Sequence, residues 1–281
     1  MIVERSPDEM QATALEWRGQ GLSVGLVPTM GFLHEGHLSL VRIARARAER
    51  VVVSLFVNPT QFGPSEDYQR YPRDEARDLE LCHAAGVDVV FAPDAPSMYA
   101  VDRSVSLSEN RLSKGLCGAS RPGHFDGVLT VVAKLFLLCQ PTVAVFGEKD
   151  AQQLRVIRRM VRDLNFPVAI MGGALVRESD GLAMSSRNKL LSPEERSQAV
   201  GLHQALLAIQ AAWEAGEVRT DALRAHALKV LERFPLAKLD YLEFVDDISL
   251  DRVQEISEPT LVALAVHFPS ARLIDNLVLQ R

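Results

Sequence analysis

Residues 24–37, Val-Gly-Leu-Val-Pro-Thr-Met-Gly-Phe-Leu-His-Glu-Gly-His, decide the class of fold. Val24–Thr29 is a short, largely apolar run without polar alternation, which predicts a strand buried on both faces of a parallel sheet. A turn with two glycines then leads into a helical pattern over His37–Arg50. A strand, a turn and a helix in this order begin a βαβ unit.

The same alternation continues through the first two-thirds of the chain. We expect further strands at Val51–Val57, Val87–Phe91, Thr142–Phe146 and Val168–Met171, and further helices at Arg73–Ala85, Val128–Leu138 and Ala151–Leu164. Strands that alternate with helices of this length predict right-handed crossovers. The expected fold is α/β, a Rossmann-like doubly wound parallel sheet.

The pattern changes after about Val176. Ser192-Pro193-Glu194-Glu195 predicts a helix start, with serine as N-cap, and that helix is expected to run to about Ala215. Another helix near Thr220–Phe234 and strands near Leu239–Val245, Leu261–His267 and Ala271–Val278 complete the chain. We therefore expect a Rossmann-like domain, residues 1–175, and a smaller α+β domain, residues 176–281.

Composition limits the function. The 281 residues carry 31 Lys or Arg and 36 Asp or Glu, and the excess of acids lies entirely in residues 190–281. Such a chain lacks the basic surface that binds nucleic acid. The N-terminus, MIVERSPDEM, has acids where a signal peptide is basic, and no apolar run is long enough for a membrane span, so we expect a cytoplasmic protein. Three scattered cysteines predict neither disulfides nor a zinc site.

The segment Pro28–His37 points to a nucleotide. Ligands of open α/β sheets bind at the carboxyl ends of strands, and a helix N-terminus there attracts an anion. His34 and His37 lie three residues apart at the helix entrance, where each can donate to a phosphate oxygen. Gly31 and Gly36 allow the backbone to approach a ligand closely.

Other interpretations of this segment remain open. Two histidines near a loop are often structural, and HEGH is one residue short of the HExxH zinc motif. The chain has neither a GxxxxGK[ST] loop nor a GxGxxG fingerprint. Gly21–Gly25 matches GxSxG, but there the strand follows the serine, whereas a nucleophile elbow needs it before.

Four further segments carry polar groups, at strand ends, in the later polar loop or just before the apolar helix at Val128–Leu138. Met184–Arg187, followed by Lys189, offers hydroxyls and a guanidinium for a triphosphate. Lys149 can neutralise a phosphate, Asp150 can accept from ribose hydroxyls, and Gln153 lies one helical turn beyond Lys149. Asn58 and Gln61 follow the Val51–Val57 strand. A solvated turn is the alternative for the Lys149 segment, and an ordinary turn built around Pro59 is the alternative for the Asn58 segment. Met184–Arg187 is weak evidence by itself, and Arg121–Phe125 is either a lid, an anion contact or a surface turn.

Together these motifs form a recognisable set. The pairing of HxGH with MSSR resembles the HIGH and KMSKS elements of the nucleotidyltransferase superfamily that includes class I aminoacyl-tRNA synthetases. PTMGFLHEGH, NPTQF, RPGHF, GEKDAQQL and MSSRN, in this order from about Val24 to Leu191, resemble the pantothenate synthetase (pantoate–β-alanine ligase) family. LDYLEFVD and RLID in the C-terminal part are similar in character but less specific. Ala151, where the family often has an aromatic residue, and Asp126 depart from its pattern.

The resemblance implies a reaction and a site. ATP and pantoate would give pantoyl adenylate and pyrophosphate, and β-alanine would then release AMP and pantothenate. Gln61 and Gln153 would hold pantoate, Gln61 would also lie near β-alanine, and Asn58 is a weaker candidate. His37 would be the proton donor, and His34, Lys149 and Arg187 would stabilise charge together with Mg²⁺ that arrives with ATP. The nucleotide would lie along Met30, Gly31, Phe32, Leu33, His34, Glu35, Gly36, His37, Gly147, Glu148, Lys149, Asp150, Val176, Met184, Ser185, Ser186 and Arg187.

The same resemblance suggests a homodimer and small-molecule substrates only. It also implies that residues 1–175 bind the nucleotide and pantoate and that residues 176–281 close over the active site. Three rival interpretations stay open at this point. A nucleotidyltransferase that keeps the nucleotide in its product would share HxGH, but it would not explain Gln61 together with Gln153. A tRNA-binding fragment conflicts with the acidic C-terminal part, and an inactive homologue conflicts with the intact polar positions of the motifs.

Overall fold

The computed structural model describes residues 1–64 and 66–280 and divides them into two compact units. The first unit comprises residues 1–111, 121–148 and 153–174, and the second comprises residues 112–120, 149–152 and 175–281. The chain therefore passes between the units several times, and the short segments 112–120 and 149–152 belong with the C-terminal part. That the second unit closes over the active site stays a prediction.

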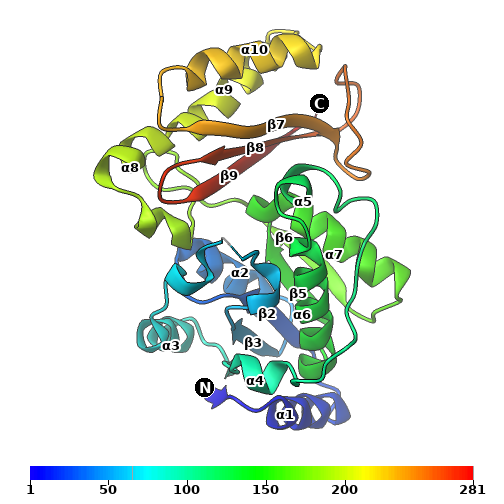
Figure 1. Ribbon diagram of the computed structural model, residues 1–281. Helices are drawn as coiled ribbons and strands as arrows, with labels where there is room; N and C mark the ends of the chain where they lie inside the picture. The colour runs from blue at the N-terminus through cyan, green and yellow to red at the C-terminus, as the bar shows by residue number, and fades with distance from the viewer. Residues whose placement is uncertain (65, 281) are drawn as a thin grey trace. The chain divides into compact units, whose positions relative to one another are not determined.

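A six-stranded sheet forms the centre of the first unit (Figure 1). Its strands are β1 Ile2–Glu4, β2 Val24–Thr29, β3 Arg50–Leu55, β4 Val89–Phe91, β5 Val143–Gly147 and β6 Ala169–Gly173. They pair in the order β1-β4-β3-β2-β5-β6, and every pairing is parallel. This arrangement confirms the predicted doubly wound sheet.

The strands are apolar on both faces, because both faces are covered. Val27, Val53 and Val145 pack with Leu40 and Val41 of α2 (Glu35–Arg45) in one core cluster. The residues that alternate with them, such as Leu26, Val52 and Ala144, point to the other face and are also fully buried. The helices that follow the strands are α3 Glu75–Ala84, α4 Ala95–Met98, α6 His124–Cys139 and α7 Ala151–Asp163.

The N-terminal helix α1, Pro7–Gly19, has the same start signal as the predicted helix at Ser192. The Ser6 hydroxyl accepts from the Glu9 amide at 3.4 Å, and Pro7 and Asp8 follow in the first turn. Neither this helix nor β1 is among the elements expected from the sequence. Applying the Ser-Pro-acid pattern at Ser6 would have found α1.

The core of the second unit is an antiparallel sheet, β7 Lys238–Asp246, β8 Thr260–His267 and β9 Arg272–Leu279 (Figure 1). Phe244, Val262 and Leu264 lie on the face that packs with helices α9 (Gly201–Glu214) and α10 (Thr220–Leu231). Val245, Leu261 and Ala263 lie on the opposite face, in a second cluster with Leu116 and Ala151. Both faces of this sheet are therefore buried.

One helix prediction in this unit was wrong. The helix expected from Pro193 to about Ala215 is divided into α8, Pro193–Ala199, and α9, which begins at Gly201. A Cβ atom at Gly201 would lie 2.5 Å from the Phe234 ring. The second helix starts at a glycine because its first residue packs directly against that ring, a tertiary contact that periodicity does not show.

Candidate active site

The first unit has a topological switch point between β2 and β5. These strands are neighbours in the sheet, with Gly25 opposite Val143, and the chain continues to β3 on one side and to β6 on the other. Ligands of open α/β sheets bind where the strand order reverses in this way. The loop with His34 and His37 follows β2, and the GEKD segment follows β5.

The loop after β2 is fixed by hydrogen bonds from its backbone amides to side chains, and not by backbone pairing with a neighbouring strand. The Thr29 hydroxyl accepts from the Gly31 amide at 3.1 Å, and the Asp78 carboxylate accepts from the Phe32 and Leu33 amides, both at 2.7 Å. Gly31 and Phe32 have φ values of 80° and 51°, in the left-handed region. Asp78, on α3, is 2% exposed and was not identified from the sequence.

The amides of Gly31, Phe32 and Leu33 thus donate hydrogen bonds to side chains of the protein itself. The backbone amides that we expect to bind an anion are therefore only those in the first turn of α2, which begins at Glu35. Burial raises the pKa of Asp78, although the two amides and the Arg77 charge oppose this effect. Arg77 also donates to the Leu33 carbonyl at 2.9 Å. Helix α3 therefore fixes the loop by two consecutive side chains.

For the adenylation of pantoate that the resemblance implies, we expect replacement of Asp78 with asparagine to lower the rate by about 10-fold, because a small misplacement of reacting groups is costly. The asparagine amide would face a backbone N–H donor, and a buried amide left unsatisfied costs about 1–3 kcal/mol of unfolding free energy. The burst of pyrophosphate from ATP and pantoate measures the rate, and Tm measures stability.

The matched control for Asp78 is Asp74→Asn. Asp74 caps α3 by accepting from the Arg77 amide at 3.2 Å, and asparagine caps helices equally well. This variant should keep the wild-type rate. If Asp78→Asn also kept it, the carboxylate would have no part in placing the loop.

His34 and His37 face each other at the entrance of α2. Their ring centroids lie 4.0 Å apart, and the His34 amide donates to Nδ1 of His37 at 3.3 Å. That bond uses the lone pair of Nδ1, so the neutral ring of His37 carries its proton on Nε2. His37 is therefore held in the tautomer that can donate from Nε2.

Gln61 is buried at the end of the turn Pro59–Gln61, which follows β3. Its Oε1 accepts from Nδ2 of Asn58 at 3.1 Å, and its Nε2 points at Sδ of Met30, 3.2 Å away. Asn58 is 1% exposed and is itself fixed by the Tyr99 hydroxyl at 2.8 Å and the Gly127 carbonyl at 3.1 Å. The orientation of the Gln61 amide is thus determined by buried partners.

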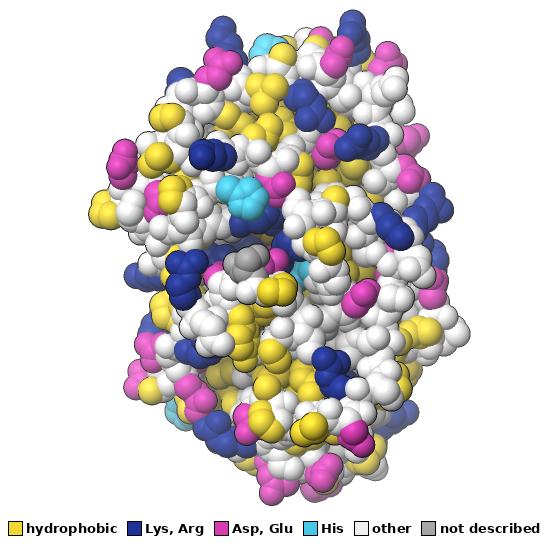
Figure 2. Space-filling view, in the orientation of Figure 1, with side chains coloured by type: hydrophobic (Ala, Val, Ile, Leu, Met, Phe, Trp, Pro, Cys, Tyr) yellow, Lys and Arg dark blue, Asp and Glu magenta, His cyan; other side chains and the backbone are white. Residues whose placement is uncertain are grey.

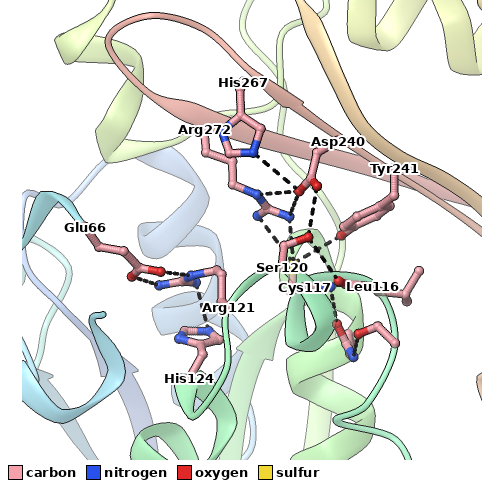
Figure 3. Close-up of polar contacts among 12 residues, drawn as sticks. Glu66, Leu116, Cys117, Ser120, Arg121, His124, Asp240, Tyr241, His267 and Arg272 are labelled. Carbon is pink, nitrogen blue, oxygen red and sulfur yellow. Dashed lines mark hydrogen bonds and ion pairs between the residues drawn. The ribbon is translucent and has the colours of Figure 1, made fainter. Parts of the chain in front are cut away.

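The RPGHF segment supports the backbone of the same residue. Nδ1 of His124 lies 2.8 Å from the Gln61 carbonyl. Nε2 of the same ring lies 3.0 Å from Arg121 (Figure 3). Arg121 also forms a two-pronged ion pair with Glu66. Burial would raise the pKa of Glu66, but the hydrogen bonds and charge of Arg121 outweigh it and lower that pKa. Asp126 lies in the first turn of α6, where the helix dipole favours an acid.

The turn after β5 contains residues of both units: Glu148 belongs to the first unit, and Lys149 belongs to the second. Glu148 forms an ion pair with Arg155 at 3.3 Å and lies so close to β6 that a Cβ at Gly172 would be 2.1 Å from its Oε1. Lys149 belongs to the second unit, and its Nζ is 3.4 Å from the Asp150 carboxylate. Gln153 is partly buried in α7 and belongs to the first unit.

The second unit brings Val176 and Met184 together. The Met184 amide donates to the Val176 carbonyl at 3.0 Å, and Arg177 pairs with Ala183, so the two predicted nucleotide neighbours lie side by side in a small hairpin. The Ser185 hydroxyl accepts from the Arg187 amide at 3.3 Å and caps the 3₁₀ turn Ser186–Leu190. Ser185 therefore has a structural role as the cap of this turn, in addition to its predicted contact with the nucleotide.

A pocket opens beside Met30 and Gly31, at the ends of β3 and β4 rather than at the switch point. Its lining includes the carboxylates of Asp74, Glu75 and Asp94, which would repel a triphosphate. We therefore favour the switch point for the nucleotide. On the face drawn in Figure 2, Lys and Arg side chains are interspersed with Asp and Glu.

Two features are absent from the described residues, 1–64 and 66–280. No group of three or more His, Cys, Asp or Glu side chains among them is arranged to hold a metal ion. None of their helices has the length and apolar character needed to cross a membrane.

The chain is similar to known proteins over nearly its whole length. A family model described as pantoate-beta-alanine ligase matches residues 2–278. Pantothenate synthetase of Solidesulfovibrio magneticus is 54% identical over 280 residues, which is 98% of this chain and 97% of that protein. The enzyme of the same name from Thermotoga petrophila is 53% identical over 279 residues, which is 99% of this chain and 100% of that one.

Solved structures agree with these sequence relationships. The crystal structure of pantothenate synthetase from Thermus thermophilus has a TM-score of 0.93 at 48% identity and covers 99% of each chain. The pantoate-beta-alanine ligase from Francisella tularensis, solved with β-γ ATP and β-alanine, has a TM-score of 0.82 at 31% identity, over 99% of this chain and 97% of that one.

Proposed function

This chain belongs to the pantoate–β-alanine ligase family, and from that premise we propose how its own side chains perform the reaction. Its function is the ATP-dependent joining of pantoate to β-alanine. Family membership decides against the nucleotidyltransferase that retains its nucleotide and against the tRNA-binding fragment. The proposed sequence of steps is adenylation of pantoate with release of pyrophosphate, then attack of β-alanine with release of AMP.

The first step needs charge stabilisation rather than a base. The pantoate carboxylate is already ionised, so it can attack the α-phosphorus directly. Charge then builds on the phosphate oxygens and on pyrophosphate, and cationic donors fixed in place lower that barrier. We assign this role to His34, His37, Lys149 and Arg187, with His37 as the proton donor. The Nε2–H tautomer of His37 supports that last assignment.

The fixed amide of Gln61 is the observation that supports the pantoate site best. Nε2 of Gln61 faces the thioether of Met30, which is a weak acceptor, so its N–H groups retain capacity for a ligand oxygen. Met30 provides an apolar surface for the branched chain of pantoate. Gln153 would hold the same substrate, and β-alanine would lie near Gln61 and use it as well.

The nucleotide would lie along the two segments that flank the switch point and along the hairpin of the second unit. The first of these segments runs from Met30 to His37, and the second runs from Gly147 to Asp150. Val176 and Met184 to Arg187 would provide the remaining contacts. Mg²⁺ would arrive with ATP and stay on its phosphates, since this ion is commonly held by substrate phosphates and water.

Pantoate-dependent exchange of labelled pyrophosphate into ATP tests the proposed adenylate. We expect exchange with pantoate in the absence of β-alanine, much weaker exchange with unbranched hydroxy acids, and free AMP once β-alanine is added. Exchange that needs β-alanine, or a product that keeps the nucleotide, would contradict the two-step mechanism.

A homodimer and a cytoplasmic location stay predictions. Light scattering of the purified protein checks the first, and a mass equal to that of one chain would contradict it.

A further inference from the structure

The residues 149–152 form a short turn between β5 and α7, yet they belong to the second unit by their contacts. Lys149, to which the proposed function gives a role in adenylation, is the first residue of this turn. Three sets of contacts bind the turn to the C-terminal sheet, two directly and one through residues 112–120. They involve the RLID and LDYLEFVD segments that the proposed function leaves without a role.

The first contact is a hydrogen bond to Lys149 itself. Nδ2 of Asn276, on β9, donates to the Lys149 carbonyl at 2.9 Å. Asn276 pairs with Ala263 in the sheet, so its side chain lies on the face that is turned away from α9 and α10. A backbone carbonyl held in this way fixes the starting point of the Lys149 side chain.

The second contact is apolar. Ala151 is 5% exposed and packs with Val245, Leu261 and Ala263 of β7 and β8. Leu116 of α5 (Leu116–Ser120) completes this cluster. The small side chain of Ala151 therefore lies directly against the C-terminal sheet.

The third contact runs through Gln152, which is 5% exposed. Its Oε1 accepts from the Cys117 amide at 2.9 Å, and its Nε2 donates to the Leu112 and Gly115 carbonyls, both at 2.8 Å. All polar atoms of this amide are thus used to join the turn to the segment 112–120. The turn moves only if that segment moves.

The segment 112–120 is in turn fixed to the sheet by a cluster of polar side chains (Figure 3). The Ser120 hydroxyl donates to Asp240 at 2.9 Å, and Sγ of Cys117 lies 3.1 Å from the Tyr241 hydroxyl. Arg272, on β9, donates to Asp240 at 2.9 Å and reaches Cys117 at 3.5 Å. Burial raises the pKa of Tyr241, so the phenol stays protonated beside this guanidinium.

The strand β9 also holds the hairpin that precedes Arg187. Asp275, next to Asn276, accepts from both terminal nitrogens of Arg177 at 2.7 and 3.0 Å, and its side chain is 1% exposed. Successive residues of a strand point to opposite faces, so one strand anchors the Lys149 turn on one face and the hairpin on the other.

We propose that Asn276 and Arg272 are positioning residues that hold Lys149 on the C-terminal sheet, so that it moves with the second unit and with the Arg187 hairpin. The proposal rests on the proposed function only for the role of Lys149. Both residues act through other groups, Asn276 through the Lys149 carbonyl and Arg272 through α5 and Gln152.

A double-mutant cycle between positions 276 and 149 tests this coupling. Asn276→Leu keeps the approximate size of the side chain but cannot donate. We expect it to slow single-turnover pyrophosphate formation by about 10-fold in the presence of Lys149, with little change in the KM for pantoate, because a misplaced cation affects the transition state. In the Lys149→Ala background the same change should have no further effect.

Three further measurements keep the outcomes distinct. Arg272→Leu should behave like Asn276→Leu, and Glu243→Gln is the control, because Glu243 pairs with Arg224 and Arg252 on the same sheet without reaching the turn. Amide hydrogen exchange should accelerate at residues 149–152 in the first two variants only. If Asn276→Leu does not fold, Asn276→Ser, which is too short to reach the carbonyl, replaces it.

Equal slowing by Asn276→Leu in both backgrounds, or unchanged exchange at residues 149–152, would overturn the proposal. A wild-type rate of Lys149→Ala would instead overturn the role that the proposed function gives to Lys149. The exchange measurement reports on the anchoring of the turn without reference to activity, so the two failures are distinguishable.

Discussion

Replacing Lys149 with alanine is expected to slow adenylation by about 10²-fold or more, which is the usual cost of removing one donor that stabilises developing charge. The side chain of Lys149 is 22% exposed, and its ammonium lies 3.4 Å from the more exposed carboxylate of Asp150. A partly exposed pair at this distance is weak, so the ammonium can transfer to a phosphate oxygen at little cost.

The effect should be specific to the first half of the reaction. Rapid-quench measurement of pyrophosphate from ATP and pantoate reports adenylation, and attack of β-alanine on adenylate formed beforehand reports the second half. Lys149→Arg keeps the charge and should recover part of the rate. Lys229, exposed in the last turn of α10, provides the control, and Lys229→Ala should leave both halves unchanged. A wild-type adenylation rate in Lys149→Ala would remove Lys149 from the mechanism.

The second large effect is expected at His37. His37→Ala should also slow adenylation by about 10²-fold or more, because the alanine variant cannot donate a proton or a hydrogen bond from the entrance of α2. The structure specifies the atom involved. Nδ1 accepts from the His34 amide, so under this proposal Nε2 would be the donor.

Replacing His37 with glutamine or with asparagine distinguishes a role of its Nε2 atom from a role of its Nδ1 atom. Glutamine can place its Nε2 near the position of the histidine Nε2, whereas asparagine is too short to do so. We therefore expect His37→Gln to recover part of the rate and His37→Asn to recover none. His226→Ala, an exposed histidine on α10, is the control. If the asparagine variant were the faster one, the donor would be Nδ1 and the assigned tautomer would be wrong.

Local sequence patterns were sufficient for the main elements of the fold. Apolar runs such as Val24–Thr29 predict strands because a residue buried on both faces of a sheet has to be apolar wherever it points. The helix start at Ser192 was equally clear, since its side chain and that of Glu195 satisfy each other's backbone amides. The division of the helix at Gly201 was not predictable, because it depends on a ring 33 residues later in the chain.

The candidate site shows the same limit. Its polar motifs were recognisable because each follows a strand or opens a helix, and such positions are defined by neighbours in the sequence. Asp78 lies in an ordinary amphipathic helix, and its sequence context gives no sign that its carboxylate reaches the amides of Phe32 and Leu33. The same is true of Asn276, which lies 127 residues from the lysine that it holds.

The sequence by itself determined the parallel sheet, the order of the motifs and the chemistry that they can perform, because these depend on residue type and on spacing along the chain. Only the tertiary structure decided which side chains fix the His34–His37 loop, which tautomer His37 adopts, and that Lys149 belongs with the C-terminal sheet. Those outcomes depend on hydrogen bonds between distant segments. Such bonds form only where folding brings a donor within about 3 Å of its acceptor, and no local pattern encodes that distance.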